Sequence, residues 1–158
     1  MTRLPSLGPR GEGWVAIQGI LLVAIALAGL LGPAWVGGFR VATSIGGALL
    51  IAAGCLLALR GTRDLRGALT PLPYPRPDAE LVQTGAYALV RHPIYGGLVL
   101  MAAGWGMLTA SPAALGGAAA LLAFFELKSR REEVWLDARF TAYAAYRTRT
   151  RRIIPWIG

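Results

Sequence analysis

Two polar stretches of the sequence hold the side chains that could carry chemistry. In the first stretch, two phenols, a guanidinium and an imidazole stand close together at Tyr87, Arg91, His92 and Tyr95. An apolar run follows at once, and Pro93 suits the first position of a helix there. Since no second His and no Cys lies near His92, this stretch does not indicate a metal site.

The second polar stretch follows the last apolar run and mixes charged with aromatic residues. It contains Glu126, Lys128, Arg130, Arg131, Glu132, Glu133, Trp135, Leu136, Phe140, Tyr143 and Tyr146. Its apolar residues recur at helical spacing, which predicts a helix. Lys128 and Glu132 are four residues apart, so by themselves they predict a surface salt bridge worth about 0.3–0.5 kcal/mol.

The segment 61–93, which ends in the first stretch, is too long to be only a connector in so small a protein. It contains four prolines, at Pro71, Pro73, Pro75 and Pro77. Its length suggests a functional loop. On composition alone, a solvated amphipathic linker that lies on lipid headgroups is an equal alternative.

Four apolar runs must position these two stretches. Residues 14–31 and 41–59 approach the roughly 20 residues that a membrane-spanning helix needs, and residues 94–109 and 112–127 form a shorter pair. The sequence therefore predicts an all-α fold, an integral membrane bundle of about four transmembrane helices. A cytoplasmic loop and a C-terminal helix complete it.

Glycine-rich turns and small residues indicate how these helices pack. Gly32-Pro33 and Gly37-Gly38 separate the first two runs, which predicts a tight hairpin of helices. Small residues within the runs suit close backbone approach between membrane helices. They include Gly46, Gly47, Gly54, Gly96, Gly97, Gly104, Gly116 and Gly117, whose spacing varies and predicts no specific interface.

Composition argues against a soluble domain and against nucleic-acid binding. The chain is 55% hydrophobic and 15% charged, with a mean hydropathy of +0.52. Its net charge of +8 comes from residues between and after the apolar runs, which fits anionic lipid headgroups better than a nucleic-acid groove. One cysteine, Cys55, allows no intramolecular disulfide. The oligomeric state is not predicted.

The distribution of Lys and Arg predicts the orientation in the membrane. Of the 16 basic residues, only Arg40 lies in a turn between the first and second runs, and none lies between the third and fourth. The others precede the first run, lie within residues 60–91, or follow Glu126. The positive-inside rule therefore places both termini and the segment 60–93 in the cytoplasm, in agreement with four passes.

Together, the two polar stretches resemble the isoprenylcysteine carboxyl methyltransferase family and its relatives among membrane phospholipid methyltransferases. Three blocks carry the resemblance: Leu-Val-x-x-Gly-x-Tyr at 81–87, Arg-His-Pro-x-Tyr-x-Gly at 91–97, and Glu132-Glu133 followed by Phe140 and Tyr-x-x-Tyr at 143–146. The chain departs from the family at Ala86, where Pro is common, and at Thr141, where Gly is common.

The resemblance implies a methyltransferase that uses S-adenosyl-L-methionine and releases S-adenosyl-L-homocysteine. Residues 1–158 would form one membrane domain, with cytoplasmic catalytic segments at 60–93 and 128–158. The implied cofactor-binding residues are Glu80, Leu81, Val82, Gly85, Tyr87, His92, Pro93, Tyr95 and Glu132. His92 suits the cofactor carboxylate, Glu132 the α-ammonium, and Leu81 with its apolar neighbours the adenine. The expected site needs no metal.

The resemblance also assigns residues to the methyl acceptor and to the structure around it. Lys128 and Glu132 are the expected catalytic residues, because Lys128 stands where the family places an Arg near the acceptor. A Lys lacks the bidentate fork of Arg, so the acceptor is open between a prenylated cysteine carboxylate and another lipid. Arg91 is expected to pair with an acid such as Glu133. The terminal basic cluster is expected to contact anionic lipid, with Trp156 as an interface anchor; the cluster comprises Arg147, Arg149, Arg151 and Arg152.

Two other functions are alternatives to the enzyme. A noncatalytic membrane protein could use its basic segments only as lipid anchors, but anchoring does not require His92, Tyr95 and Glu132 together. A small transporter would have ionisable residues inside its spans, and the apolar runs contain none before Glu126.

Overall fold

The computed structural model describes residues 5–35, 37–65, 70, 72, 74 and 79–154, and in this part of the chain the fold is all-helical, as predicted. The helices are α1 (Glu12–Leu31), α2 (Arg40–Leu65), the short 3-10 helix η2 (Gly85–Ala88), α3 (Pro93–Leu108), α4 (Pro112–Arg139) and α5 (Tyr143–Arg149). Pro71, Pro73, Pro75, Pro77 and Trp156 lie outside the described residues.

Two helices continue beyond the apolar runs that predicted them. α2 extends past residue 59 to Leu65, and α4 extends past residue 127 to Arg139. Apolar composition marks only the part of a helix that faces lipid or core, whereas Leu, Lys, Arg and Glu all have high helix propensity and let the helix continue. The predicted catalytic segment 128–158 therefore begins inside α4, on a rigid element.

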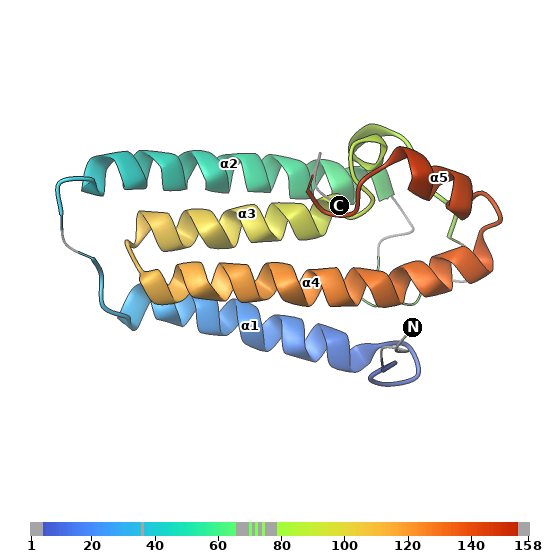
Figure 1. Cartoon of the computed structure of the whole chain (residues 1–158), viewed down its shortest axis with the longest axis horizontal. Coiled ribbons are helices and arrows are strands. Elements are labelled where there is room, and N and C mark those ends of the chain that lie inside the picture. The colour runs from blue at the N-terminus through green and yellow to red at the C-terminus, as the bar shows by residue number, and fades with distance from the viewer. Residues whose placement is uncertain are drawn as a thin grey trace.

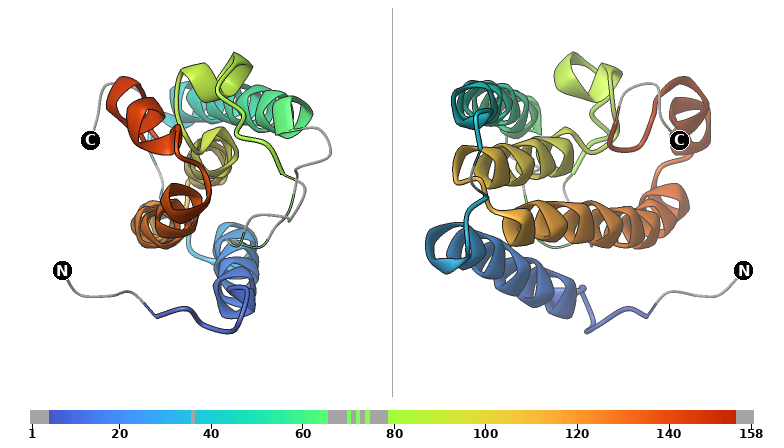
Figure 2. Two further views of the ribbon diagram at one scale, coloured as in Figure 1. Left: turned by 90° about the vertical axis from the view of Figure 1, so that its right-hand side faces the viewer. Right: turned by 60° about the vertical axis from the view of Figure 1, so that its left-hand side comes forward.

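The four long helices lie side by side in the order α2, α3, α4, α1 (Figure 1). α1 packs on α4, and α3 and α4 separate it from α2, as the two further views show (Figure 2). The predicted tight hairpin of the first two helices is therefore wrong. The segment between α1 and α2 instead runs past the turn between α3 and α4. There the Trp35 amide donates a hydrogen bond of 2.9 Å to the carbonyl oxygen of Ala110.

Glycines explain why α3 takes the place beside α2. A Cβ on Gly47 would lie 2.6 Å from the carbonyl oxygen of Gly104, and one on Gly97 would lie 2.6 Å from that of Gly54. Only hydrogen fits at such contacts, so these glycines let the two backbones touch. The expected close approach is confirmed here. Gly116, by contrast, faces open space.

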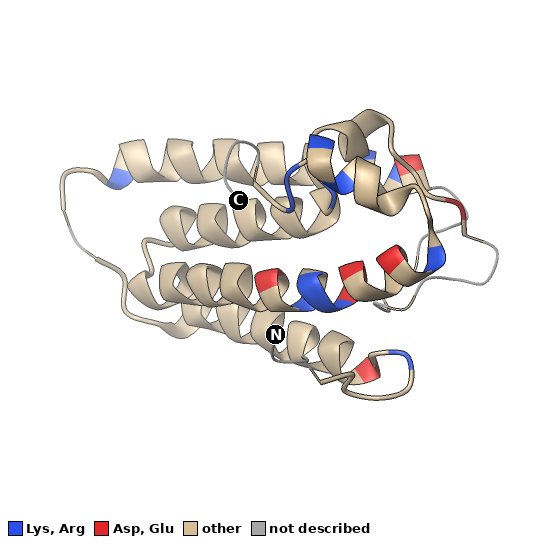
Figure 3. Ribbon diagram, turned by 45° about the vertical axis from the view of Figure 1, so that its right-hand side comes forward, with Lys and Arg blue, Asp and Glu red and all other residues tan. Residues whose placement is uncertain are grey.

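The surface of the bundle fits a membrane at its centre and a polar medium at one end. α1 and α2 are long and apolar enough to cross a bilayer, and large side chains such as Ile20 and Leu49 are exposed on them. α3 has 16 residues and rises about 24 Å, less than a typical hydrocarbon core. Apart from Arg40, the charged residues of the described ranges gather toward the other end (Figure 3).

Candidate active site

A cavity of about 340 Å³ lies at the charged end of the bundle, where α1, α2, α3, α4, α5 and the loop before α3 meet. Eight of the residues predicted from the sequence line it: Glu80, Leu81, Val82, Tyr87, His92, Tyr95, Lys128 and Glu132. Segments that are far apart in the chain thus bring most of the predicted site into one space.

The other two predicted residues, Gly85 and Pro93, lie beside the cavity without lining it. Gly85 begins η2 with a φ of 62°, and a Cβ there would collide with the carboxylate of Asp64. That carboxylate accepts a hydrogen bond from the Ala86 amide at 2.7 Å, which ties η2 to the end of α2. Pro93 is buried as the first residue of α3. Both residues shape the backbone that presents their neighbours.

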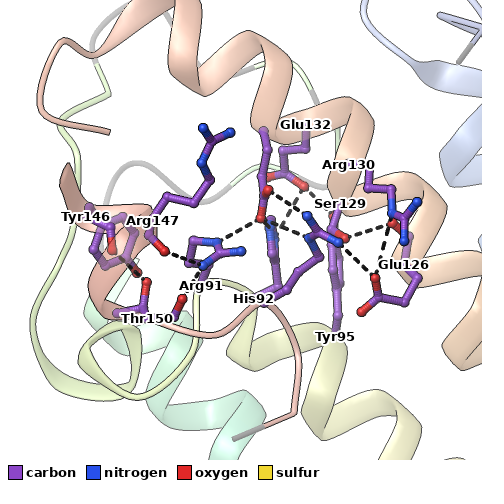
Figure 4. A network of polar contacts seen from close by, with 12 residues as sticks. Arg91, His92, Tyr95, Glu126, Ser129, Arg130, Glu132, Tyr146, Arg147 and Thr150 are labelled. Atoms are coloured by element: carbon purple, nitrogen blue, oxygen red, sulfur yellow. Dashed lines mark hydrogen bonds and ion pairs between the residues drawn. The ribbon is translucent and has the colours of Figure 1, made fainter. Parts of the chain in front are cut away.

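His92, Tyr95 and Glu132 converge on one wall of the cavity (Figure 4). The Tyr95 hydroxyl donates to Glu132 Oε2 at 2.8 Å, and His92 Nδ1 lies 3.7 Å from the same oxygen. The His92 and Tyr95 rings stack, with centroids 5.2 Å apart and an interplanar angle of 2°. Their spacing at the start of α3 puts both rings on one side of the helix, facing α4.

The neighbouring acid, Glu133, is paired with basic side chains from outside α4. Arg91 Nε donates to its Oε1 at 2.8 Å, which confirms the expected pairing, and His92 Nε2 lies 3.3 Å from the same oxygen. Arg152 donates to both carboxylate oxygens, at 3.2 and 3.1 Å. Burial alone raises the pKa of Glu133, but these hydrogen bonds, from His92 first, hold that pKa well below its usual value. Glu133 is therefore a buried anion that fixes its neighbours.

The same network holds residues 150–152, which follow α5, beside the site. The amides of Arg91 and His92 donate to the carbonyl oxygens of Arg151 and Arg152 at 2.8 and 2.9 Å. Arg91 Nη1 also donates to the carbonyl oxygen of Thr150. Arg152 was expected to contact lipid, and for this residue the expectation is wrong, because it turns inward to Glu133 and to Glu126, the latter at 2.9 Å. Two buried or half-buried acids offer a better partner than an exposed headgroup.

Lys128 does not form the surface salt bridge that its spacing from Glu132 suggested. The residue is 1% exposed, because α1 packs over this part of α4. Its Nζ donates to Gln18 Oε1 of α1 at 2.6 Å and lies 5.0 Å from the centre of the Tyr95 ring. A contact across helices thus replaces the contact along one helix.

Some cavity residues were missed by the sequence reasoning. Gln18 lines the cavity from α1, and its only signal was that it is polar in an apolar run. Tyr143 and Tyr146 stood in a matching block, but no role was given to them. Tyr146 donates to the Tyr87 carbonyl at 2.6 Å, and burial raises its pKa to about 12. The hydroxyl of Tyr143 is buried and has no partner among the described residues.

Comparison with known proteins agrees with this geometry. The sequence profile of the phospholipid methyltransferase family matches residues 42–142, well over half of the chain. The match runs from α2 to the end of α4 and includes every predicted site residue. Among curated proteins and solved structures, none matches the chain. With its helical bundle, its two apolar spans and this profile match, the chain belongs to the phospholipid methyltransferase family of membrane methyltransferases.

Proposed function

We propose that this protein transfers a methyl group from S-adenosyl-L-methionine to a lipidic acceptor at the cytoplasmic surface of a membrane. The observation that carries the proposal is the convergence of His92, Tyr95 and Glu132 on a cavity that also exposes apolar side chains. A lipid anchor has no use for this constellation, because anchoring requires only basic and aromatic residues at the interface.

The cavity fits the cofactor in size and in chemistry. Its volume of about 340 Å³ falls in the range of small-molecule sites. The carboxylate of Glu132 complements an α-ammonium, His92 can donate to a carboxylate, and Leu81 and Val82 offer an apolar surface for adenine. Tyr143 also lines the cavity, and its buried hydroxyl, which has no partner among the described residues, gains one if a polar ligand binds within its reach.

The cofactor supplies a methyl carbon that is activated by its bond to a sulfonium. The work left to the protein is therefore to place the acceptor atom opposite that bond and to hold both reactants there. Tyr95 keeps Glu132 in place by its hydrogen bond, and Glu133 fixes the His92 ring. An acceptor carboxylate has no proton to lose, whereas an amine acceptor must lose one.

A lipid is the acceptor that the surroundings of the cavity favour. The walls of the cavity include Leu98, about one turn beyond Tyr95 in α3, and Gln18, which lies within the apolar run of α1. α1 and α2 expose large apolar side chains such as Ile20 and Leu49, so an acyl or prenyl chain can lie along the apolar surface of the bundle while its headgroup reaches the cavity. The acceptor is either a prenylcysteine-type carboxylate or another lipid headgroup.

We also propose that residues 1–158 form one catalytic membrane domain whose active site and termini face the cytoplasm. The excess of Lys and Arg at the cavity end supports this orientation, because positively charged segments are retained on the cytoplasmic side. Four passes of the chain are consistent with the antiparallel bundle, in which the start of α1 and helix α5 both lie toward the cavity end.

Binding of S-adenosylhomocysteine to the purified protein in detergent tests the cofactor assignment. We expect His92→Ala and Glu132→Gln each to weaken binding by about tenfold or more, since each removes a charge-assisted contact. Asp137→Asn is the matched control, because Asp137 lies on the same helix, is exposed and does not line the cavity. Equal affinities in all four proteins would overturn the assignment. Incubating membranes with methyl-labelled cofactor then identifies the labelled lipid.

A further inference from the structure

The contact between Gln18 and Lys128 joins the cavity to a helix that the family profile does not include. The profile begins at residue 42, in α2, whereas Gln18 lies about two turns from the start of α1. Its amide oxygen accepts a hydrogen bond of 2.6 Å from Lys128 Nζ, and both side chains line the cavity. An amide in an apolar helix thus has a defined partner at the edge of the proposed active site.

Lys128 is a buried cation that forms no ion pair in the described part of the chain. Burial lowers the pKa of its ammonium, and the charge of Glu132, one turn along α4, offsets this lowering only in part. An ammonium has three donors, and one of them is used by the neutral amide of Gln18. The rings of Tyr95 and Phe125, at 5.0 and 6.0 Å, add only the weak attraction of their faces. A buried charge of this kind is costly unless it is paired, so an anionic group in the cavity would complete the site.

Glu132 and Lys128 lie at different ends of the cavity, which suits two different ligands, the cofactor and the lipid acceptor. Glu132 lies one turn of α4 closer to the end of the bundle than Lys128, and it is held by Tyr95. Leu98, which also lines the cavity, lies about one turn of α3 beyond Tyr95 toward the apolar half of that helix, and Gln18 contacts Lys128 itself. A negative group of a lipid that enters from the apolar side therefore meets Lys128 before it reaches Glu132.

We propose that Gln18 is a positioning residue that holds the ammonium of Lys128 toward the cavity, where it binds an anionic oxygen group of the lipid acceptor. The group is a carboxylate or a phosphate, and both offer the oxygen acceptors that an ammonium requires. This inference rests on the proposed function and adds to it the charge of the acceptor. It assigns part of acceptor selection to α1.

The test measures acceptor binding to the full chain in the absence of cofactor. One probe is a farnesylated N-acetylcysteine with a free carboxylate, and the other is phosphatidylethanolamine; both are presented in alkyl maltoside micelles, whose detergent carries neither a carboxylate nor a phosphate. Gln18→Glu keeps the size of the side chain but places a carboxylate against Lys128, so it should occupy the ammonium and weaken binding of the probe by about tenfold or more. Gln18→Leu should weaken binding less. Ile20→Ala, on the same helix with a side chain that is 69% exposed, is the control.

Two further measurements separate positioning from a general structural defect. In Gln18→Glu, the KM for the acceptor should rise while kcat changes little, and the affinity for S-adenosylhomocysteine should match that of the wild type. If only the farnesylated acid binds more weakly to the Gln18 variants, the group bound by Lys128 is a carboxylate. If the phospholipid binds more weakly, the group is a phosphate.

Unchanged binding of both probes in Gln18→Glu and Gln18→Leu would overturn the inference. A parallel loss of S-adenosylhomocysteine affinity would overturn it as well, because Lys128 would then serve the cofactor. A wild-type protein that binds no S-adenosylhomocysteine contradicts the proposed function instead. Since probe binding is measured without cofactor, the two failures are distinguishable.

Discussion

Replacing Glu133 by Gln removes the negative charge at the centre of the network beside the cavity. The carboxylate lies 2.8 Å from Arg91 Nε, 3.1 Å from Arg152 Nη2 and 3.3 Å from His92 Nε2. Its side chain is 5% exposed, so water cannot take the place of the lost charge. Two guanidinium groups would face a neutral amide. Breaking a buried ion pair by removing one partner costs about 3–5 kcal/mol, which is the loss in the free energy of unfolding that we expect.

Glu126→Gln is the matched control for this variant. Glu126 lies two turns earlier on α4 and contacts the same arginine, with 2.9 Å between its Oε2 and Arg152 Nη1. Its side chain is 36% exposed, so solvent screens the pair. Such pairs contribute about 0–1 kcal/mol. The two variants make the same chemical change and differ mainly in burial.

The free energy of unfolding is measured by denaturant titration in detergent micelles, with circular dichroism reporting the helix content. A loss of about 3–5 kcal/mol corresponds to a fall in Tm of about 10 °C for a chain of this size. We expect this fall for Glu133→Gln and a fall of at most a few degrees for Glu126→Gln. Equal losses in the two variants would refute the reasoning that burial of Glu133 makes the network stabilising.

Three further outcomes follow from the structure. The pKa of Glu133 is lower in the folded chain than its ordinary 4.5. The ionised carboxylate therefore stabilises the fold fully above pH 4.5, and this stabilisation is lost as the pH falls below that value. A plot of Tm against pH should be less steep below pH 4.5 for Glu133→Gln than for the wild type. Tyr143→Phe removes a hydroxyl without a partner in the described structure, so it should leave Tm unchanged or higher while weakening S-adenosylhomocysteine binding in calorimetry. Gly97→Ala should lower the free energy of unfolding by about 1–3 kcal/mol because its Cβ meets the Gly54 carbonyl at 2.6 Å, whereas Gly116→Ala, in open space, should not.

Local patterns predicted the helices and most of the site, because those depend on neighbours in the chain. The apolar runs are visible as continuous segments, and the motif around His92 keeps its residues within one turn of α3. The order of the helices in the bundle was not predictable in this way. It depends on contacts such as that of Gly47 with Gly104, which join residues 57 positions apart, and such a pairing leaves no signal in either helix alone.

The partner of Lys128 was likewise not predictable from neighbours in the chain. Spacing along a helix suggested a partner four residues away, and that reading would hold for an exposed helix face. The partner is instead Gln18, 110 residues away in the chain, because α1 covers this face of α4. A polar residue alone in an apolar run indicates that a partner exists, but only the packing of the helices identifies it.

The adjacent pair Glu132-Glu133 has two roles because neighbouring residues on a helix point about 100° apart. One carboxylate faces the cavity, and the other lies in the network that joins the start of α3, α4 and the segment after α5. His92 contacts both, at 3.7 and 3.3 Å, so the structural network and the proposed binding groups share one ring. A change that loosens Glu133 must therefore move His92 as well, and stability and cofactor affinity should fall together there. The side chain of Glu132 is 22% exposed and forms no ion pair with an arginine in the described structure. Its replacement should therefore lower the affinity for the cofactor without a comparable loss of stability.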